Sequence, residues 1–226
     1  MYCSRCTEYV PASVKALDVE RFHIQADLSR LNCAICGSFI AVIEDGRVFN
    51  IDDRFEEVIE NGWKKVRTDR ERICYYVLSQ IIYPEFDTPR ADKFESLYDY
   101  ADEFDDIILR WENGRPIGFY TVKPKGTEIH ATGVMYSMPT VDTAYVRGQY
   151  RNRGIGLEIL SDVITRHPID DVGFSRPIST GMMRVLERFL TRRKDYRLRF
   201  WEIQDGDETS EKLVWFLLRN RKRGNT

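Results

Sequence analysis

The stretch from residue 141 to residue 166 constrains the fold of this chain most, because a strand signal runs into a helix signal through a glycine-containing loop. Residues 141–146 alternate apolar and polar side chains and are rich in strand formers. From Ile155 onward, apolar residues recur at helical spacing until His167-Pro168 ends the helix. We therefore expect a strand, a tight loop and a helix N-terminus in direct succession.

This loop predicts an anion site. The first N–H groups of a helix have no intrahelical partner and lie at the positive end of its dipole. Gly154 and Gly156 would let a ligand approach the backbone, while Arg151 and Arg153 add positive charge. The loop is thus expected to hold a diphosphate. Its spacing matches neither the Walker loop nor the dinucleotide fingerprint, and a plain strand-to-helix turn closed by glycine is the alternative.

The composition indicates a globular protein, and 226 residues allow one large domain or a domain with a small module. The 34 basic side chains nearly balance the 36 acidic ones, so no overall field favours a nucleic-acid site. No apolar run could span a bilayer, and residues 1–5 carry no signal-peptide pattern. We expect a nuclear or cytoplasmic protein that is not secreted, with its cysteines present as thiols or metal ligands.

Four of the five cysteines form two Cys-x-x-Cys pairs separated by 26 residues, Cys3 with Cys6 and Cys33 with Cys36. Two such pairs can complete a tetrahedral thiolate site for Zn²⁺, and Gly37 permits the tight turn that such a pair needs. The separation exceeds the usual range of about 15 to 20 residues. Two unrelated pairs beside a hairpin are the alternative. We predict a zinc-ribbon-like segment over residues 1–37.

The next elements are a hairpin, a short helix and a long helix. Residues 39–43 and 48–51 flank Asp45-Gly46, a strong hairpin signal, and residues 52–60 suggest a short helix. Residues 68–71 form a capping box that opens a helix ending at Tyr83-Pro84. Its apolar stripe is expected in the core and consists of Ile73, Val77, Leu78, Ile81 and Ile82.

Residues 84–106 carry nine acidic side chains against two basic ones, with aromatic residues interleaved. The aromatic residues predict a partly packed segment rather than a disordered tail. Two interpretations remain open. The segment is either a solvated connector or an acidic rim that attracts a lysine or polyamine substrate.

The second half of the chain predicts more strands than helices. Strands are expected at residues 107–112 and 117–123 around a hairpin turn, and at 127–137, 172–175 and 197–203. Ser179 can cap a helix that carries Met182 to Leu190, and another helix is expected over residues 210–218. This order predicts a mixed α+β fold, with a mostly antiparallel sheet flanked by helices and a small Cys-rich segment at the N-terminus.

The string Val-x-x-x-Tyr-Arg-x-x-Gly-Ile-Gly-Leu at residues 146–157 resembles the coenzyme A motif of the Gcn5-related N-acetyltransferase superfamily. The resemblance extends over residues 38–218 and leaves residues 219–226 as a basic tail. It implies acetyl-CoA as cofactor, with the backbone N–H groups of residues 152–157 on the pyrophosphate and the pantetheine along Tyr145 and Val146. The implied cofactor-binding residues are Tyr145, Val146, Arg151, Asn152, Arg153, Gly154, Ile155, Gly156 and Leu157.

A narrower set of motifs resembles the soluble lamina-associated proteins called family with sequence similarity 169. The matching stretches are residues 70–73, 79–83, 116–124, 186–190 and 200–203. This family resembles acetyltransferases, but its phosphate loop is often degraded, whereas the loop of this chain is intact. The resemblance implies two functions. One is acetyl transfer to a primary amine on a protein lysine, an N-terminus or a small molecule, and the alternative is an inactive interaction module at the nuclear lamina.

Catalysis would need a base for the amine and an acid for the leaving thiolate, with the thioester carbonyl polarised by a backbone N–H such as that of Val146. Many members of the superfamily carry an acid tyrosine where this chain has Phe189 and Leu190. For each candidate the alternative is an ordinary polar role, because polar residues near strand ends are common. The candidate catalytic residues are Glu128, His130, Asp142, Tyr145 and Ser175.

Overall fold

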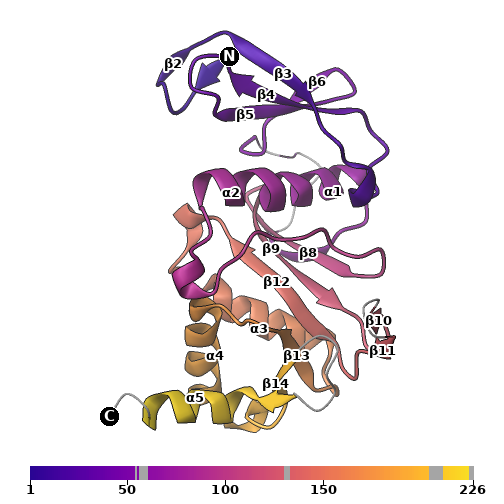
Figure 1. Cartoon of the computed structure of the whole chain (residues 1–226), viewed down its shortest axis with the longest axis vertical. Coiled ribbons are helices and arrows are strands. Elements are labelled where there is room, and N and C mark those ends of the chain that lie inside the picture. Colours follow the sequence, from indigo (N-terminus) through magenta and orange to yellow (C-terminus); the bar gives the residue numbers. More distant parts are fainter. Residues whose placement is uncertain (54, 56–60, 130–132, 204–210, 224–226) are drawn as a thin grey trace.

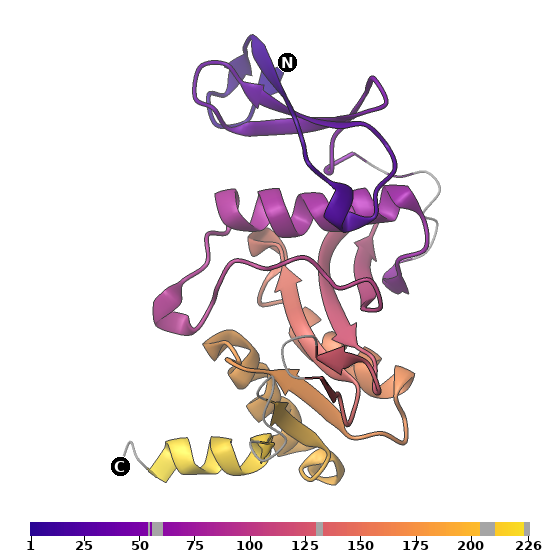
Figure 2. The ribbon, with the colours of Figure 1, turned by 45° about the vertical axis from the view of Figure 1, so that its right-hand side comes forward.

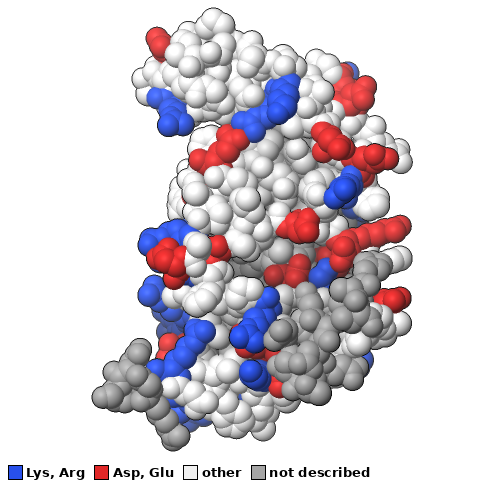
Figure 3. All heavy atoms as spheres, viewed as in Figure 1, with Lys and Arg blue, Asp and Glu red and all other residues white. Residues whose placement is uncertain are grey.

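A computed structural model describes residues 1–53, 55, 61–129, 133–203 and 211–223. Its layers are stacked along the long axis, with the N-terminus near one end and the C-terminus near the other (Figure 1). A small sheet packs on a long helix, that helix packs on a seven-stranded sheet, and further helices from the second half of the chain cover the opposite face of the large sheet. Basic and acidic side chains are interspersed on the face seen in Figure 3.

The N-terminal part forms a small module of antiparallel strands. β1 (Tyr2–Cys3) pairs with β2 (Glu8–Tyr9), and a four-stranded sheet follows with the order β3-β4-β5-β6. These four strands are Ala12–Ala16, Leu28–Cys33, Phe39–Glu44 and Arg47–Phe49. The predicted hairpin is confirmed, because Asp45 and Gly46 both have positive φ. The domain boundary expected after residue 37 falls inside this sheet.

The long helix has three consecutive parts, α1 (Asp69–Tyr76), the π-helical segment η2 (Val77–Ile82) and α2 (Tyr83–Phe86). Thr68 and Glu71 make both bonds of the predicted capping box, and the predicted apolar stripe lies in the core. The predicted end at Tyr83-Pro84 is wrong. The wider π turn places Pro84 in the first turn of α2, where its missing N–H costs no hydrogen bond, so the helix continues to Phe86.

The large sheet has the strand order β15-β14-β13-β12-β9-β8-β7. The first four of these strands are Lys212–Leu213, Phe200–Ile203, Val172–Ser175 and Thr140–Val146. The other three are Arg115–Lys123, Asp106–Glu112 and Gly62–Lys65. Only the β12–β13 and β13–β14 pairs are parallel. The predicted class, a mixed and mostly antiparallel sheet flanked by helices, is confirmed.

Helices cover both faces of the large sheet. α3 (Ile155–Arg166), α4 (Thr180–Arg192) and α5 (Val214–Arg223) share one core cluster, to which β12 and β13 contribute Val141 and Phe174. α1 and η2 share the other cluster with the small sheet and with Phe119 and Tyr145 of the large sheet. Short 3-10 turns lie at Glu20–Phe22, Ala91–Lys93, Gly148–Tyr150 and Lys194–Tyr196.

The acidic segment is a packed connector. We call residues 87–105 the strap, because they leave α2 and return across the large sheet to β8 (Figure 2). The ring of Tyr98 stacks on Tyr83 with centroids 4.4 Å apart, and Arg21 donates to the Tyr100 hydroxyl over 2.7 Å. Most strap carboxylates are exposed, so an acidic rim at the strap surface stays a prediction.

Several other predicted elements differ from the structure. Residues 127–137 contain a hairpin of β10 (Glu128–Ile129) and β11 (Val134–Met135) rather than one strand. The strand expected from residue 197 begins at Phe200, after a 3-10 turn. The last helix begins at Val214 rather than near residue 210. Most of the helix predicted over residues 52–60 lies outside the described residues.

Candidate functional site

The open edge of β12 is the first part of the site. β12 pairs with β13 only at Thr140 and Val141, whereas on its other side it pairs with β9 as far as Val146. The N–H of Arg147 donates to Ile117 on the β9 side. Because backbone groups alternate direction along a strand, the N–H and C=O groups of Ala144 and Val146 face the opposite, open side. The predicted polarising N–H of Val146 therefore points into the gap between β12 and β13.

Side chains from two other elements bind the carbonyl groups along this open edge. The hydroxyl of Tyr98 on the strap donates to the Ala144 carbonyl over 2.9 Å. Nε of Arg151 donates to the Val146 carbonyl over 2.8 Å. An extended ligand that carries amide groups could pair with this edge, in the manner of an added strand, once these two side chains release the carbonyls.

The N-terminus of α3 is the second part of the site. Gly154 precedes the helix with φ +90°, and Asn152 is also left-handed with φ +62°. Within the described part of the chain, no acceptor bonds the backbone N–H groups of residues 152–156. Five consecutive donors at the positive end of a helix form a site for an anion. Leu157 differs from the prediction, because its N–H donates to the Gly154 carbonyl over 2.8 Å.

Glycine is needed at positions 154 and 156 of the loop for two different structural reasons. Gly154 is required by its left-handed backbone, and a Cβ there would meet nothing within 4 Å. A Cβ on Gly156 would lie 2.8 Å from Cγ2 of Val185 on α4, so Gly156 allows α3 and α4 to pack closely. Ile155 is buried among core side chains. Neither Gly156 nor the Ile155 side chain is therefore, by itself, a sign of a ligand.

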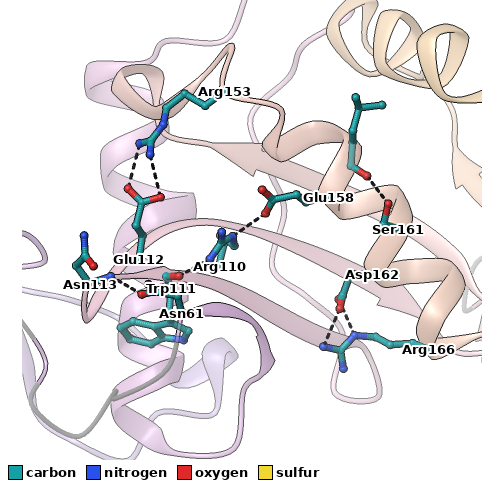
Figure 4. A network of polar contacts seen from close by, with 11 residues as sticks. Asn61, Arg110, Trp111, Glu112, Asn113, Arg153, Glu158, Ser161, Asp162 and Arg166 are labelled. Atoms are coloured by element: carbon teal, nitrogen blue, oxygen red, sulfur yellow. Dashed lines mark hydrogen bonds and ion pairs between the residues drawn. The ribbon is translucent and has the colours of Figure 1, made fainter.

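The two arginines of the loop also differ. Arg153 makes two bonds to Glu112 of β8, with Nη–Oε distances of 3.0 and 3.2 Å (Figure 4). Figure 4 also shows that Arg110 of β8 pairs with Glu158 of α3. Two ion pairs therefore join β8 to α3 and to the loop that precedes it. Arg151 pairs less closely with an acid, because its Nη2 lies 3.9 Å from Oδ2 of Asp87, while its Nε donates to the Val146 carbonyl.

Asp87, at the start of the strap, is a site residue that sequence reasoning missed. Its Oδ2 accepts the Tyr145 hydroxyl over 2.5 Å and the Gly148 N–H over 2.7 Å. Burial and this carboxylate both raise the pKa of Tyr145 above its ordinary value of 10. The Tyr145 hydroxyl therefore keeps its proton and directs it toward Asp87.

The other predicted catalytic residues are dispersed. Glu128 is exposed on β10, Asp142 is half-buried on β12, and His130 lies outside the described residues. Ser175 ends β13, and its buried Oγ has no hydrogen-bond partner among the described residues. In the same part of the chain, no bond or ion pair joins any two of Glu128, Asp142, Tyr145 and Ser175. Phe189 and Leu190 are buried in the core, so that position supplies no acid.

Asp142 belongs to the electrostatic environment of a buried lysine. Nζ of Lys123 lies 2.6 Å from Asp102 and 3.0 Å from Asp105, both on the strap. Burial alone would lower the pKa of Lys123, but Asp102, Asp142 and Asp105 together raise it above 10.5. Lys123 is therefore a charged anchor that holds the strap on β9.

The cysteine cluster lies apart from this site, in the N-terminal module. The sulfur atoms of Cys3, Cys6, Cys33 and Cys36 all lie within 4.8 Å of one another. The two Cys-x-x-Cys turns have the same backbone form, in which the residue after the second cysteine is left-handed and donates its N–H to the first cysteine's carbonyl. These residues are Thr7 (φ +59°, 2.8 Å) and Gly37 (φ +72°, 2.9 Å). Four convergent thiols of this kind could hold a metal ion.

Comparison with known proteins gives two kinds of similarity, and no family model matches the chain. Protein FAM169B from Mus musculus is 34% identical over 161 residues, which cover 69% of this chain and 47% of that protein. Protein FAM169BP from Homo sapiens is 31% identical over 120 residues, covering 52% of this chain and 62% of that protein. The chain thus spans only part of the length of either curated relative.

Two solved structures are similar to this chain at low TM-scores. The E. coli protein YhhK, a proposed N-acetyltransferase solved bound to coenzyme A, is 19% identical with a TM-score of 0.37, covering 59% of this chain and 89% of that one. A ribosomal-protein-alanine N-acetyltransferase from Brucella melitensis is 14% identical with a TM-score of 0.36, covering 57% and 90%. No helix within the described residues is long and apolar enough to cross a membrane. In sequence, the chain is similar to FAM169B and FAM169BP over much of its length.

Proposed function

We propose that this chain binds acetyl-CoA and transfers the acetyl group to a primary amine on a protein lysine, an N-terminus or a small molecule. The observation that carries the proposal is the pairing of two features within one stretch of chain. Five N–H groups at the start of α3 have no acceptor among the described residues, and the strand just before them has an open edge. A diphosphate and an amide-containing arm are the groups that these two features fit.

Each residue then has a defined role. The N–H groups of residues 152–156 bind the pyrophosphate, and Arg151 neutralises part of its charge. The N–H and C=O groups of Ala144 and the C=O group of Val146 bind the pantetheine arm, after Tyr98 and Arg151 release the two carbonyls. The Val146 N–H polarises the thioester carbonyl, which lowers the barrier to direct attack by the amine.

Calorimetric titration with acetyl-CoA tests the binding step. Gly154→Ala places a side chain on a backbone with φ +90° and should weaken binding at least tenfold. Gly126→Ala is the matched control, because Gly126 has φ +82° and equal space around its Cα but lies far along the chain from the loop. Arg151→Glu should also weaken binding. A folded wild-type chain that binds no acetyl-CoA would refute the proposal and favour the inactive interaction module at the nuclear lamina.

We propose separately that the four cysteines hold a structural zinc ion. Zn–S bonds of about 2.3 Å in a tetrahedron place sulfur atoms about 3.8 Å apart. The separations are 3.7 Å between Cys3 and Cys36 and 3.8 Å between Cys6 and Cys33, which together are two opposite edges of such a tetrahedron. Backbone N–H groups also point at the sulfur atoms of Cys3 and Cys33. Four thiolates supply the soft ligands that zinc prefers.

Metal analysis of the purified chain tests this second proposal. We expect one equivalent of zinc in the wild type and in Cys74→Ala, because Cys74 is buried in the other core and is not part of the cluster. Cys33→Ser should reduce the zinc content well below one equivalent. Cobalt replacement should give the absorption of a tetrahedral thiolate site. A metal-free wild type that keeps its N-terminal fold would contradict the proposal.

A further inference from the structure

A tyrosine on the strap lies at the open edge of β12. The Tyr98 ring is held by its stacking on Tyr83, and its backbone carbonyl accepts a bond from the Gln80 side chain over 3.3 Å. The Tyr98 hydroxyl reaches Ala144, whose carbonyl faces the gap between β12 and β13. Sequence reasoning treated this tyrosine only as part of the acidic segment. The strap therefore delivers a fixed phenol to the place where a ligand along β12 would lie.

A second and independent observation marks the same gap as polar. Val172 and Phe174 of β13 point into the core beneath α3 and α4, so Ser175, the next residue, points to the opposite face. That is the face on which the strap and the Tyr98 ring lie. The Ser175 Oγ is buried and lacks a partner among the described residues. A buried hydroxyl without a partner is costly, and a ligand in the gap would satisfy it.

We infer that Tyr98 donates the proton that the coenzyme sulfur needs when it leaves. This inference rests on the proposed acetyl transfer. The amine nitrogen attacks the thioester carbon and forms the C–N bond, and the C–S bond then breaks with its electron pair moving to sulfur. The sulfur takes the phenol proton and becomes a thiol. The proton released by the new amide nitrogen returns to the phenolate through water, so charge and atoms balance.

The surroundings of Tyr98 suit a donor rather than a base. Burial raises the pKa of Tyr98 well above its ordinary value of 10, and the neighbouring hydroxyls of Tyr83 and Tyr145 act in the same direction. The phenol is therefore fully protonated at neutral pH. Phe189 and Leu190 place only apolar atoms in the core, so the strap supplies the hydroxyl that α4 lacks.

The test uses the full metal-replete chain with Tyr98→Phe, which keeps the ring and removes only the hydroxyl. Tyr100→Phe is the matched control, because Tyr100 lies on the same strap but its hydroxyl bonds Arg21. The first measurement is the pKa of the coenzyme A thiol in the binary complex, determined from the absorbance of the thiolate as the pH is changed. A phenol that donates to sulfur stabilises the thiolate, so this pKa should be about one unit or more higher in Tyr98→Phe than in the wild type.

The second measurement is thiol release from acetyl-CoA with spermidine or a lysine-containing peptide as acceptor. Turnover should fall about 100-fold or more in Tyr98→Phe and stay unchanged in Tyr100→Phe, with similar coenzyme A affinities in all three chains. Suppose that Tyr98→Phe still binds coenzyme A and that the thiol pKa in its complex equals the wild-type value. This result would overturn the role of Tyr98 and leave the proposed function standing. Absence of coenzyme A binding in the wild type would overturn both.

Discussion

At the scale of single residues, Asp87 joins the strap, β12 and the loop. Its carboxylate accepts from the buried Tyr145 hydroxyl and from the Gly148 N–H. In Asp87→Ala both donors lose their acceptor; the exposed Gly148 N–H can bond water instead, but the buried Tyr145 hydroxyl is left unpaired, which costs free energy. We predict that this substitution lowers the free energy of unfolding by about 2 to 3 kcal/mol, measured by urea denaturation.

The control for this prediction is Asp92→Ala. Asp92 also lies on the strap, but its partner is the exposed Arg90 at 2.9 Å, and exposed ion pairs contribute little. Its loss should change the unfolding free energy by less than about 0.5 kcal/mol. Equal effects of the two substitutions would mean that Asp87 makes no special contribution.

The contrast between Arg151 and Asp87 shows what sequence can predict at this scale. Arg151 and Gly154 stand within one short motif, so a local pattern is enough to nominate both; in the structure Gly154 is the N-cap of α3 and Arg151 donates to the Val146 carbonyl. Asp87 has partners that are 58 and 61 positions away. No local pattern marks such a residue, because its role arises only when the strap crosses the sheet. An aspartate next to an aromatic residue at the end of a helix was the only available signal.

At the scale of elements, the packing of α3 on α4 depends on Gly156. A Cβ at this position would lie 2.8 Å from Cγ2 of Val185, too close for a normal contact. Gly156→Ala should therefore lower the free energy of unfolding by about 1 to 3 kcal/mol, because the two helices must separate. Thermal or urea denaturation measures this change.

A double-mutant cycle separates packing from helix propensity. Val185→Ala removes the methyl groups that an added Cβ would meet, so the double variant should recover much of the stability that Gly156→Ala loses. If the two changes simply add, the collision with Val185 is not the reason for glycine at this position. The same glycine was expected from the sequence to admit a ligand, and the structure adds a packing reason that the motif could not reveal.

The C-terminus of α3 gives a prediction about pH. Burial lowers the pKa of His167 below 6.5, although Asp170 and Asp106 act in the opposite direction. The unfolded chain therefore binds the proton more readily, and stability falls as the pH drops below about 6.5. In His167→Gln this part of the pH dependence should disappear. Denaturation of both chains between pH 8 and pH 5 measures the difference, and parallel curves would contradict the assignment.

The predicted end of a helix was right where the signal came from residues that are close together in the sequence. The capping box at Thr68 and Glu71 uses residues three apart, and both of its bonds form. The predicted stop at Tyr83-Pro84 failed, because the π-helical segment before it shifts the hydrogen-bond pattern so that Pro84 fits inside a new first turn. The apolar periodicity of η2 predicts a helix but does not encode this change in helix type.

At the scale of the whole molecule, the layers explain why the two candidate sites can be tested apart. The base of the small sheet shares a core with α1 through Val42 and Phe49, whereas the cysteine end has only a small cluster of Cys3, Val10 and Cys33. Ion pairs at Arg30–Glu85 and Arg70–Glu44 add further links between the module and the long helix. The module is thus anchored at its base, and its tip has a much smaller core.

Metal removal should therefore loosen the module only in part. If the proposed zinc ion is bound, it should order the two Cys-x-x-Cys turns, because the core beside them is only the small cluster of Cys3, Val10 and Cys33. With a chelator, amide hydrogen exchange should quicken at residues 3–10 and 33–38, and stay slow at Val42 and in β8, β9 and β12. Added zinc should restore protection. If the whole small sheet exchanged fast, the shared core with α1 would be too weak to hold it. If nothing changed, the thiols would be ordered by packing alone, and the zinc proposal would lose its structural role.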